Sequence, residues 1–304
     1  VDDWSNKIQL LLADKKLREE ITFNSLNDFK TKYNWDIRAE TILNLKQDNT
    51  KEIFSKYIVD KKLYSRGLRI KDRRLRIFPN WYIKGNFLFY INCIFGGVNF
   101  ENKNVLDIGS GTGIYSIYAS LSGAKNVVSI EPETEGSHND MINTFKSLKE
   151  KFNCKNIEIV NAKIQEFNSE KKFDIVIMHN AINHLDEEAT LKLSYNIEAQ
   201  KIYINLLKKL RSKLNDDSEL IITDCSNRNF FGDLKIKNPF APQIEWNKHN
   251  SPELWTEILI KSGVKSVKTN WINHSSLRTL GLIIFGNKYL SYFLDSYFLI
   301  KCKN

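Results

Sequence analysis

The feature that most constrains this chain is a short apolar strand that runs directly into three closely spaced glycines. Residues 104–113 read N-V-L-D-I-G-S-G-T-G, and a helical pattern begins at about residues 112–114. Glycine lets the chain turn sharply and lets a ligand approach the main chain, because no Cβ stands in the way. The first N–H groups of the following helix have no partner inside it and can also bind a ligand. The loop therefore predicts a ligand site at the end of this strand.

Short segments rich in Val and Ile alternate with helical patterns from about residue 101 to the end of the sequence. This alternation is typical of a parallel sheet covered by helices on both faces. We expect strands at 104–108, 127–130, 157–160, 173–178, 219–223, 265–272 and 297–303, and helices at 114–122, 137–152, 188–214 and 252–262. An apolar stretch at 277–294 lies between the last two strands. Lys288 and Asp295 interrupt it, which favours a buried element over an interfacial helix.

The spacing of the glycines distinguishes this loop from a dinucleotide site. It is G-x-G-x-G, not G-x-G-x-x-G, and Ile114 stands where close helix packing would need a small residue. Asp107, two residues before the first glycine, would repel a pyrophosphate and attract an ammonium group. Glu131 lies 24 positions after Asp107, at the end of the second strand, where an acid can accept both hydroxyls of a ribose. These features favour a nucleoside that carries an amino acid, and S-adenosylmethionine satisfies all of them.

Over about residues 101–304 the sequence resembles the class I S-adenosylmethionine-dependent methyltransferases. The resemblance implies an α/β, Rossmann-like seven-stranded sheet whose last strand, at 297–303, is antiparallel. It also implies that Asp107 takes the methionine amino group, directly or through water. In the family an acidic and then a small residue meet the adenine, whereas this chain has Asn161 and Ala162. The implied cofactor-binding residues are Asp107, Gly109, Ser110, Gly111, Gly113, Glu131, Pro132, Asn161, Ala162, Lys163, His179 and Asn180.

The end of the fourth strand supplies the first candidates for catalysis. Residues 178–185 resemble the stretch of quinone-type and many small-molecule methyltransferases in which an acid and a His follow an apolar pair. His184 matches the His, and Asn183 replaces the acid. The polar-Pro-Pro-aromatic motif of nucleic-acid base modifiers is absent, which argues against base amines as acceptors. A hydroxyl acceptor must lose a proton, and a His is suited to remove it. We expect His184, His249 and His179 to be the catalytic candidates.

An insert at 225–251 separates the fifth strand from the next helix. Loops of this length are usually functional or disordered, and the aromatic content of this one argues against disorder. We therefore expect it to be a lid over the acceptor pocket. Its candidate substrate-binding residues are Arg228, Phe231, Glu245 and Trp246.

Residues 1–78 form a predicted helical N-terminal cap with a basic ribbon at 61–76, and residues 79–304 form the predicted methyltransferase domain. The ribbon holds eight Lys and Arg and one acid, in a chain whose net charge is +9. It is either an anion site, for phosphate, carboxylate or nucleic acid, or a solvated charged hairpin.

The favoured function is methyl transfer from S-adenosylmethionine to a small, possibly anionic acceptor, most readily to oxygen with His-assisted deprotonation. The alternatives are an RNA- or protein-directed methyltransferase that uses the ribbon, and a cofactor-binding protein without turnover. Nucleic acid is the less favoured partner, because the insert carries mixed charge. We expect no metal site, because the four cysteines are scattered. We also expect no membrane span and a cytoplasmic location. The sequence leaves the oligomeric state open.

Overall fold

This computed structural model describes residues 2–32, 50–61, 63, 80–132, 140–239, 241, 244–272 and 277–304. Most of the basic ribbon, together with His138 and His274, lies outside these ranges. The chain divides into two compact units, residues 1–50 and 51–304. In the first unit, α1 (Asp2–Ala13) and α2 (Lys15–Lys32) follow one another, and Asp14 Oδ1 accepts a hydrogen bond from Leu17 N at 3.0 Å. The division falls earlier than the boundary expected at residue 78.

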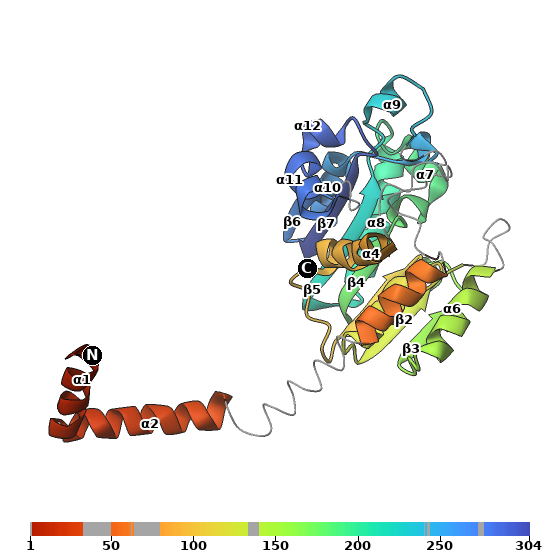
Figure 1. Cartoon of the computed structure of the whole chain (residues 1–304). Coiled ribbons are helices and arrows are strands. Elements are labelled where there is room, and N and C mark those ends of the chain that lie inside the picture. The colour runs from red at the N-terminus through yellow and green to blue at the C-terminus, as the bar shows by residue number, and fades with distance from the viewer. Residues whose placement is uncertain are drawn as a thin grey trace. The chain divides into compact units, whose positions relative to one another are not determined.

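The second unit is built on one seven-stranded sheet (Figure 1). Its strands are β1 (Asn104–Ile108), β2 (Asn126–Ile130), β3 (Ile157–Val160), β4 (Phe173–His179), β5 (Leu214–Cys225), β6 (Ser266–Trp271) and β7 (Tyr297–Lys303). Their order is β3-β2-β1-β4-β5-β7-β6. β1 to β5 pair in parallel, and β7 runs antiparallel to both β5 and β6. The predicted fold class, with its antiparallel last strand, is confirmed.

Side chains that alternate along the strands bury two cores, one on each face of the sheet. Leu106 and Val176 belong to the first core and Val105 and Ile177 to the second. The first core is covered by α8 (Ile197–Arg211) and α10 (Pro252–Lys261), and the second by α4 (Asn80–Phe95), α5 (Ile114–Leu121) and α6 (Asp140–Lys151). The shorter helices are α7 (Glu187–Lys192), α9 (Phe230–Asp233), α11 (Arg278–Phe285) and α12 (Lys288–Ser291), with single turns η2 (Ile182–His184) and η3 (Trp246–Lys248).

The helix over 50–60, which belongs to the predicted cap, packs on the sheet unit. Phe54 and Ile58 are fully buried in the second core. The ring of Phe54 lies 5.0 Å from that of Phe152, just beyond α6, in an edge-to-face contact. Apolar burial of this kind accounts for its place in the second unit.

Two sequence predictions were wrong in detail. The single helix expected at 188–214 is two helices, α7 and α8, because the Asn196 side chain caps α8 by accepting hydrogen bonds from Glu198 N and Ala199 N. The apolar stretch at 277–294 is not a buried element. It forms α11 and α12, and Ile283 and Tyr289 are 74% and 81% exposed.

Candidate active site

A cavity of about 780 Å³, here called the main cavity, opens at the carboxyl ends of β1, β2 and β4. It is lined by Ile108, Gly109, Gly111, Ile130, Glu131, Pro132, Met141, Lys163, Ile164, Gln165, Asn180, Ala181, His184, Leu185, Asp186 and Glu187. In open α/β sheets ligands bind at this edge of the sheet. Its volume is in the range of small-molecule and cofactor sites.

The glycines after β1 have backbone conformations that other residues rarely adopt. Gly109 and Gly113 have φ of 68° and 75°. A Cβ on Gly109 would lie 2.6 Å from Ala181 Cβ, and one on Gly113 would lie 2.1 Å from the ring of Phe145. Glycine is therefore required both for the turn and for the close packing around it. Gly109 and Gly111 line the main cavity, whereas Ser110 and Gly113 do not.

Glu131, at the end of β2, turns its carboxylate toward the glycine loop. Its Oε2 accepts a hydrogen bond from Gly111 N at 2.7 Å. Burial raises the pKa of Glu131, while the hydrogen bond from Gly111 and the charge of His184 oppose this rise. A carboxylate thus lies in the wall of the main cavity beside Pro132.

Asp107 lies behind the loop and does not line the main cavity. It is fully buried, and its Oδ2 accepts a hydrogen bond from Ser116 Oγ of α5 at 2.5 Å. Its Oδ1 has no hydrogen-bond partner among the described residues. Burial raises the pKa of Asp107 to about 7, with the Ser116 hydrogen bond opposing the rise. The structure therefore does not show the carboxylate facing the cavity, as direct binding of an ammonium group would require.

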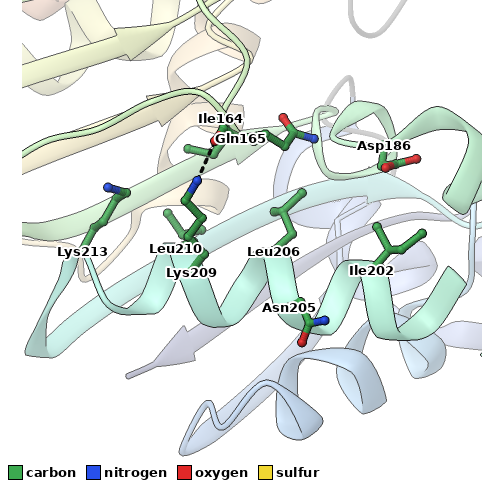
Figure 2. Close-up of a pocket in the computed structure, with 9 residues that line it drawn as sticks. All are labelled: Ile164, Gln165, Asp186, Ile202, Asn205, Leu206, Lys209, Leu210 and Lys213. Carbon is green, nitrogen blue, oxygen red and sulfur yellow. Dashed lines mark hydrogen bonds between the residues drawn. The ribbon is translucent and has the colours of Figure 1, made fainter. Parts of the chain in front are cut away.

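After β3, only Lys163 of the predicted trio lines the main cavity, and Asn161 and Ala162 do not. The next residues, Ile164 and Gln165, were missed by the sequence analysis although they follow the strand directly. A smaller cavity of about 280 Å³ shares these two residues and Asp186 (Figure 2). Its other lining residues come from α8 and the turn after it: Ile202, Asn205, Leu206, Lys209, Leu210 and Lys213.

The three histidines proposed from the sequence lie in different surroundings. His184, on η2, lines the main cavity, and its side chain is 49% exposed. Its Nδ1 lies 2.9 Å from Glu187 Oε1, and this hydrogen bond lowers the pKa of Glu187. Lys248 of the insert lies 3.3 Å from the other oxygen of Glu187 and 2.7 Å from Glu245. Charged contacts thus join the insert to the wall of the main cavity.

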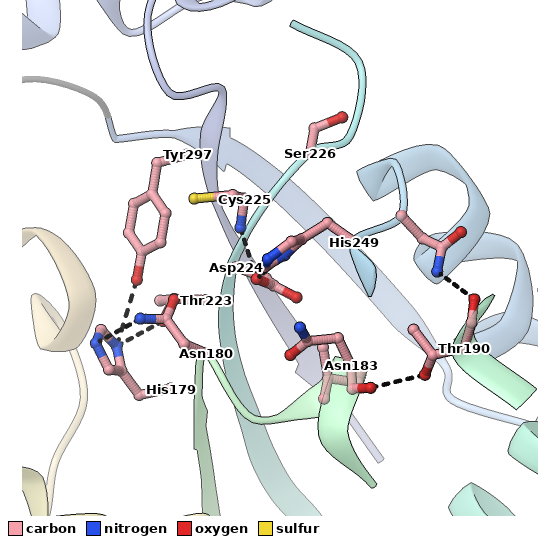
Figure 3. A network of polar contacts seen from close by, with 12 residues as sticks. His179, Asn180, Asn183, Thr190, Thr223, Asp224, Cys225, Ser226, His249 and Tyr297 are labelled. Carbon is pink, nitrogen blue, oxygen red and sulfur yellow. Dashed lines mark hydrogen bonds and ion pairs between the residues drawn. The ribbon is translucent and has the colours of Figure 1, made fainter. Parts of the chain in front are cut away.

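His179 ends β4 among tyrosines, and it does not line the main cavity. Its Nε2 lies 2.9 Å from Tyr115 Oη. Its Nδ1 lies 2.7 Å from Thr223 Oγ1 and 3.4 Å from Tyr297 Oη (Figure 3). Its ring also lies 4.3 Å from that of Tyr115. Both ring nitrogens of this partly buried histidine are therefore held by hydroxyl groups.

His249 pairs with an acid that the sequence analysis did not single out. Its Nδ1 lies 2.9 Å from Oδ1 of Asp224, which stands one residue before the end of β5 (Figure 3). The side chain of His249 is 12% exposed and that of Asp224 is fully buried. The same Oδ1 accepts a hydrogen bond from Cys225 N at 2.7 Å. In the sequence, the feature that could have indicated Asp224 is its position at the end of a strand, soon after the apolar residues 220–222.

A buried polar cluster extends from this pair to η2 and α7. Tyr203 Oη donates to Ile182 O at 2.9 Å. Burial raises the pKa of Tyr203, and the charges of Asp186 and Asp224 add to this rise. Thr190 Oγ1 donates to Asn183 O at 2.7 Å, while Thr190 O accepts from Asn250 Nδ2 at 3.2 Å. Three side-chain atoms of the cluster have no hydrogen-bond partner among the described residues. They are Asp224 Oδ2 and the Oδ1 and Nδ2 of the fully buried Asn183.

The predicted substrate-binding residues fall into two groups. Arg228 and Phe231 lie at α9, where Arg228 contacts Asp233 at 3.5 Å and its side chain is 73% exposed. Glu245 and Trp246 lie at η3, and the Trp246 ring is 6.1 Å from that of His249. Within the described residues, no cluster of His, Cys, Asp and Glu could hold a metal ion.

Comparison with known proteins identifies the family of this fold. The family model of the methyltransferase domain matches residues 99–267, which hold β1 to β5 and the residues around the main cavity. The chain belongs to this family. It is a class I S-adenosylmethionine-dependent methyltransferase. Its cofactor is S-adenosylmethionine.

Other similarities are more distant. The chain is 29% identical over 90 residues to protein arginine N-methyltransferase PRMT10 of Arabidopsis thaliana, and 32% identical over 89 residues to histone-arginine methyltransferase CARMER of Drosophila erecta. Each match covers 29% of this chain but only 22% and 16% of the relative. A methyltransferase structure from Aquifex aeolicus is 15% identical, with a TM-score of 0.47 over 70% of this chain and 88% of that one.

The main cavity fits the cofactor of this methyltransferase. Its carboxylate at Glu131 suits the ribose hydroxyls, and glycines at 109 and 111 leave main-chain atoms accessible. Ile108, Ile130, Ile164 and Leu185 make part of its wall apolar. None of the described helices is long and apolar enough to cross a bilayer.

Proposed function

We propose that this methyltransferase acts on a hydroxyl group of a small-molecule acceptor and that His249, oriented by Asp224, removes the hydroxyl proton. The observation that carries the proposal is the 2.9 Å contact between His249 Nδ1 and Asp224 Oδ1. A carboxylate at Nδ1 favours the tautomer that has its proton on Nδ1 and a lone pair on Nε2. Nε2 has no hydrogen-bond partner among the described residues. His249 is thus suited to act as a general base.

When bound, the cofactor supplies a methyl group that its sulfonium has already activated. In the proposed transfer, the acceptor oxygen forms the new bond to the methyl carbon as the carbon–sulfur bond breaks, and its proton passes to His249 Nε2. The electron pair of the broken bond remains on sulfur. Residues of this chain have to hold the acceptor oxygen in line with that bond, and such positioning lowers the barrier substantially.

The other two histidines suit this role less well. His179 has both nitrogens within 2.9 Å of hydroxyl groups. His184 is half exposed and contacts Glu187, and both residues line the main cavity. This contact suits His184 to hold Glu187 in place. Lys248, next to His249, contacts Glu187 in the cavity wall, so the insert connects the proposed base to the cofactor site.

A small acceptor is favoured because the His249–Asp224 pair is largely buried. A second candidate is transfer to protein arginine, which is the activity named for PRMT10 and CARMER. The unpartnered Oδ2 of Asp224 gives that candidate a specific basis, since a buried carboxylate oxygen can accept from a guanidinium.

The test supplies S-adenosylmethionine with a radioactive methyl group to the protein and a whole-cell extract. The extract is then separated into small molecules, protein and RNA. We expect label in the small-molecule fraction, and none with Glu131→Ala, which should lose the cofactor. Label that appears only in protein or RNA would overturn the proposal in favour of the corresponding macromolecular acceptor. No transfer by a protein that binds S-adenosylhomocysteine would favour a cofactor-binding protein without turnover.

A further inference from the structure

Large apolar side chains gather on the surface of the segments that follow β5 and precede β7. Ile283 is 74% exposed, Tyr289 81% and Phe293 52%. Single exposed apolar residues are common on protein surfaces, but a cluster of them can mark a binding surface. We call this set the apolar patch, and its members are Leu234, Ile236, Leu280, Ile283, Ile284, Tyr289, Leu290 and Phe293.

Topology places all of these segments at the edge of the sheet that carries the active site. β5 ends at Cys225, which pairs with Tyr297, the first residue of β7. The end of β6 at Trp271 pairs with Phe298. The connections after β5, after β6 and before β7 therefore leave from the same edge, and Figure 1 shows α9, α11 and α12 beyond it.

Direct contacts join α9 and α12 into one surface. The ring of Phe230 lies 5.5 Å from that of Phe293, and Tyr292 Oη donates to Asp233 Oδ2 at 3.0 Å. Leu234 and Ile236 directly follow α9, so they stand beside this contact. The patch thus continues from one segment to the next.

The apolar character of α11 extends to its solvent side. Gly281 is buried, whereas Leu280, Ile283 and Ile284 are exposed. On a surface helix of a soluble domain the outer face is normally polar. The outer face of α11 therefore suits an apolar environment.

Positive charge surrounds the patch. Residues 228–239 and 277–295 hold five Lys and Arg and only two acids. The basic residues are Arg228, Lys235, Lys237, Arg278 and Lys288. Arg228 pairs with Asp233, which also accepts from Tyr292, and Lys288 pairs with Glu253 of α10 at 2.6 Å. Lys235 and Lys237 have no ion pair among the described residues. The surface thus combines exposed apolar side chains with a net positive charge.

We propose that the apolar patch docks this protein on a bilayer surface that contains anionic lipids. The apolar side chains would enter the boundary between headgroups and acyl chains, and the surrounding cations would lie at the lipid phosphates. Charge favours this partner over a second copy of the chain, because a twofold interface would bring the positive surface against itself. The inference is independent of the acceptor proposed above.

The test measures cosedimentation of the full chain with vesicles of phosphatidylglycerol and phosphatidylcholine, and with vesicles of phosphatidylcholine alone. We expect stronger binding to the anionic vesicles. Ile283→Glu and Phe293→Glu should each weaken it about tenfold or more, because each removes an apolar side chain from the interface. Lys235→Gln and Lys237→Gln should each weaken binding to the anionic vesicles about fivefold.

Ile197→Glu is the matched control, since Ile197 is 69% exposed on α8, outside the patch. It should bind vesicles like the original protein, and a thermal melt of each variant should confirm that it folds. Absence of binding to anionic vesicles would overturn the proposal, as would patch variants that bind no more weakly than Ile197→Glu. A dimer in sedimentation velocity that Ile283→Glu dissociates, without lipid binding, would assign the patch to a second copy instead.

Discussion

His249 and Asp224 join the insert after β5 to the buried end of that strand, with 2.9 Å between Nδ1 of the histidine and Oδ1 of the carboxylate. The two residues are separated by 25 positions in the chain. The contact therefore fixes the insert and the imidazole at the same time.

Asp224→Asn tests the role of this contact. An amide cannot hold the Nδ1 proton as a carboxylate does, so the imidazole loses its preferred tautomer. We expect the rate of methyl transfer to fall about 10²–10⁴-fold, while affinity for S-adenosylhomocysteine is retained. Asp216→Asn, at an exposed position of the same strand, is the control and should leave the rate unchanged. Equal rates for both variants would exclude Asp224 from catalysis.

Glu131→Gln tests the cofactor site. Gln keeps the size of the side chain and loses the charge that favours hydrogen bonds from ribose hydroxyls. We expect the Kd for S-adenosylhomocysteine, measured by calorimetry, to rise about 10–100-fold, because hydrogen bonds to charged groups contribute about 1.5–3 kcal/mol. Glu166→Gln, at an exposed position after β3, should bind like the original protein. If the two variants bind alike, Glu131 does not contact the ribose.

Asn183→Leu tests whether the unpartnered amide of Asn183 lowers the stability of the fold. Both polar atoms of the Asn183 side chain are buried without a partner among the described residues, which costs free energy. We expect the free energy of unfolding in urea to rise by about 1–3 kcal/mol on substitution by Leu. Asn250 is the matched control, since it is also buried but donates to Thr190 O. Asn250→Leu should lower the free energy of unfolding. A comparable loss in both variants would mean that Asn183 has a structural role.

The pKa of Asp107 predicts a pH dependence of stability without ligand. Burial raises this pKa from 3.8 to about 7. Between these values the folded chain keeps a proton that the unfolded chain releases, so the free energy of unfolding falls as pH rises. The slope from this group is at most about 1.4 kcal/mol per pH unit. Asp107→Asn should flatten the dependence between about pH 4 and about pH 7, measured by urea unfolding. Parallel curves for the two proteins would contradict this.

The part of the site that could be predicted from the sequence lies in short continuous segments. The glycines at 109–113 follow β1 directly, and Glu131 follows β2, so strand patterns alone place them at one edge of the sheet. The antiparallel β7 was predicted through the resemblance to a known family. These features depend only on which residues directly follow each strand, and they do not depend on the path of any long loop.

The rest depends on contacts between distant residues. The acid partner of His249 is set by the path of the insert, which sequence patterns do not determine. The break between α7 and α8 depends on a side-chain cap at Asn196, because Asn also occurs inside helices. The outward face of α11 was missed because an apolar stretch indicates burial but does not identify what covers it.

The most direct test of the proposed base is the pH dependence of single-turnover methyl transfer, compared between the original protein and His249→Gln. A general base takes a proton only in its unprotonated form, so in the original protein we expect the rate to rise with pH and then level off. In the variant we expect a rate at least about 100-fold lower near neutral pH, without that inflection, and unchanged affinity for S-adenosylhomocysteine. A variant with the original rate and the same pH profile would show that His249 does not take the proton.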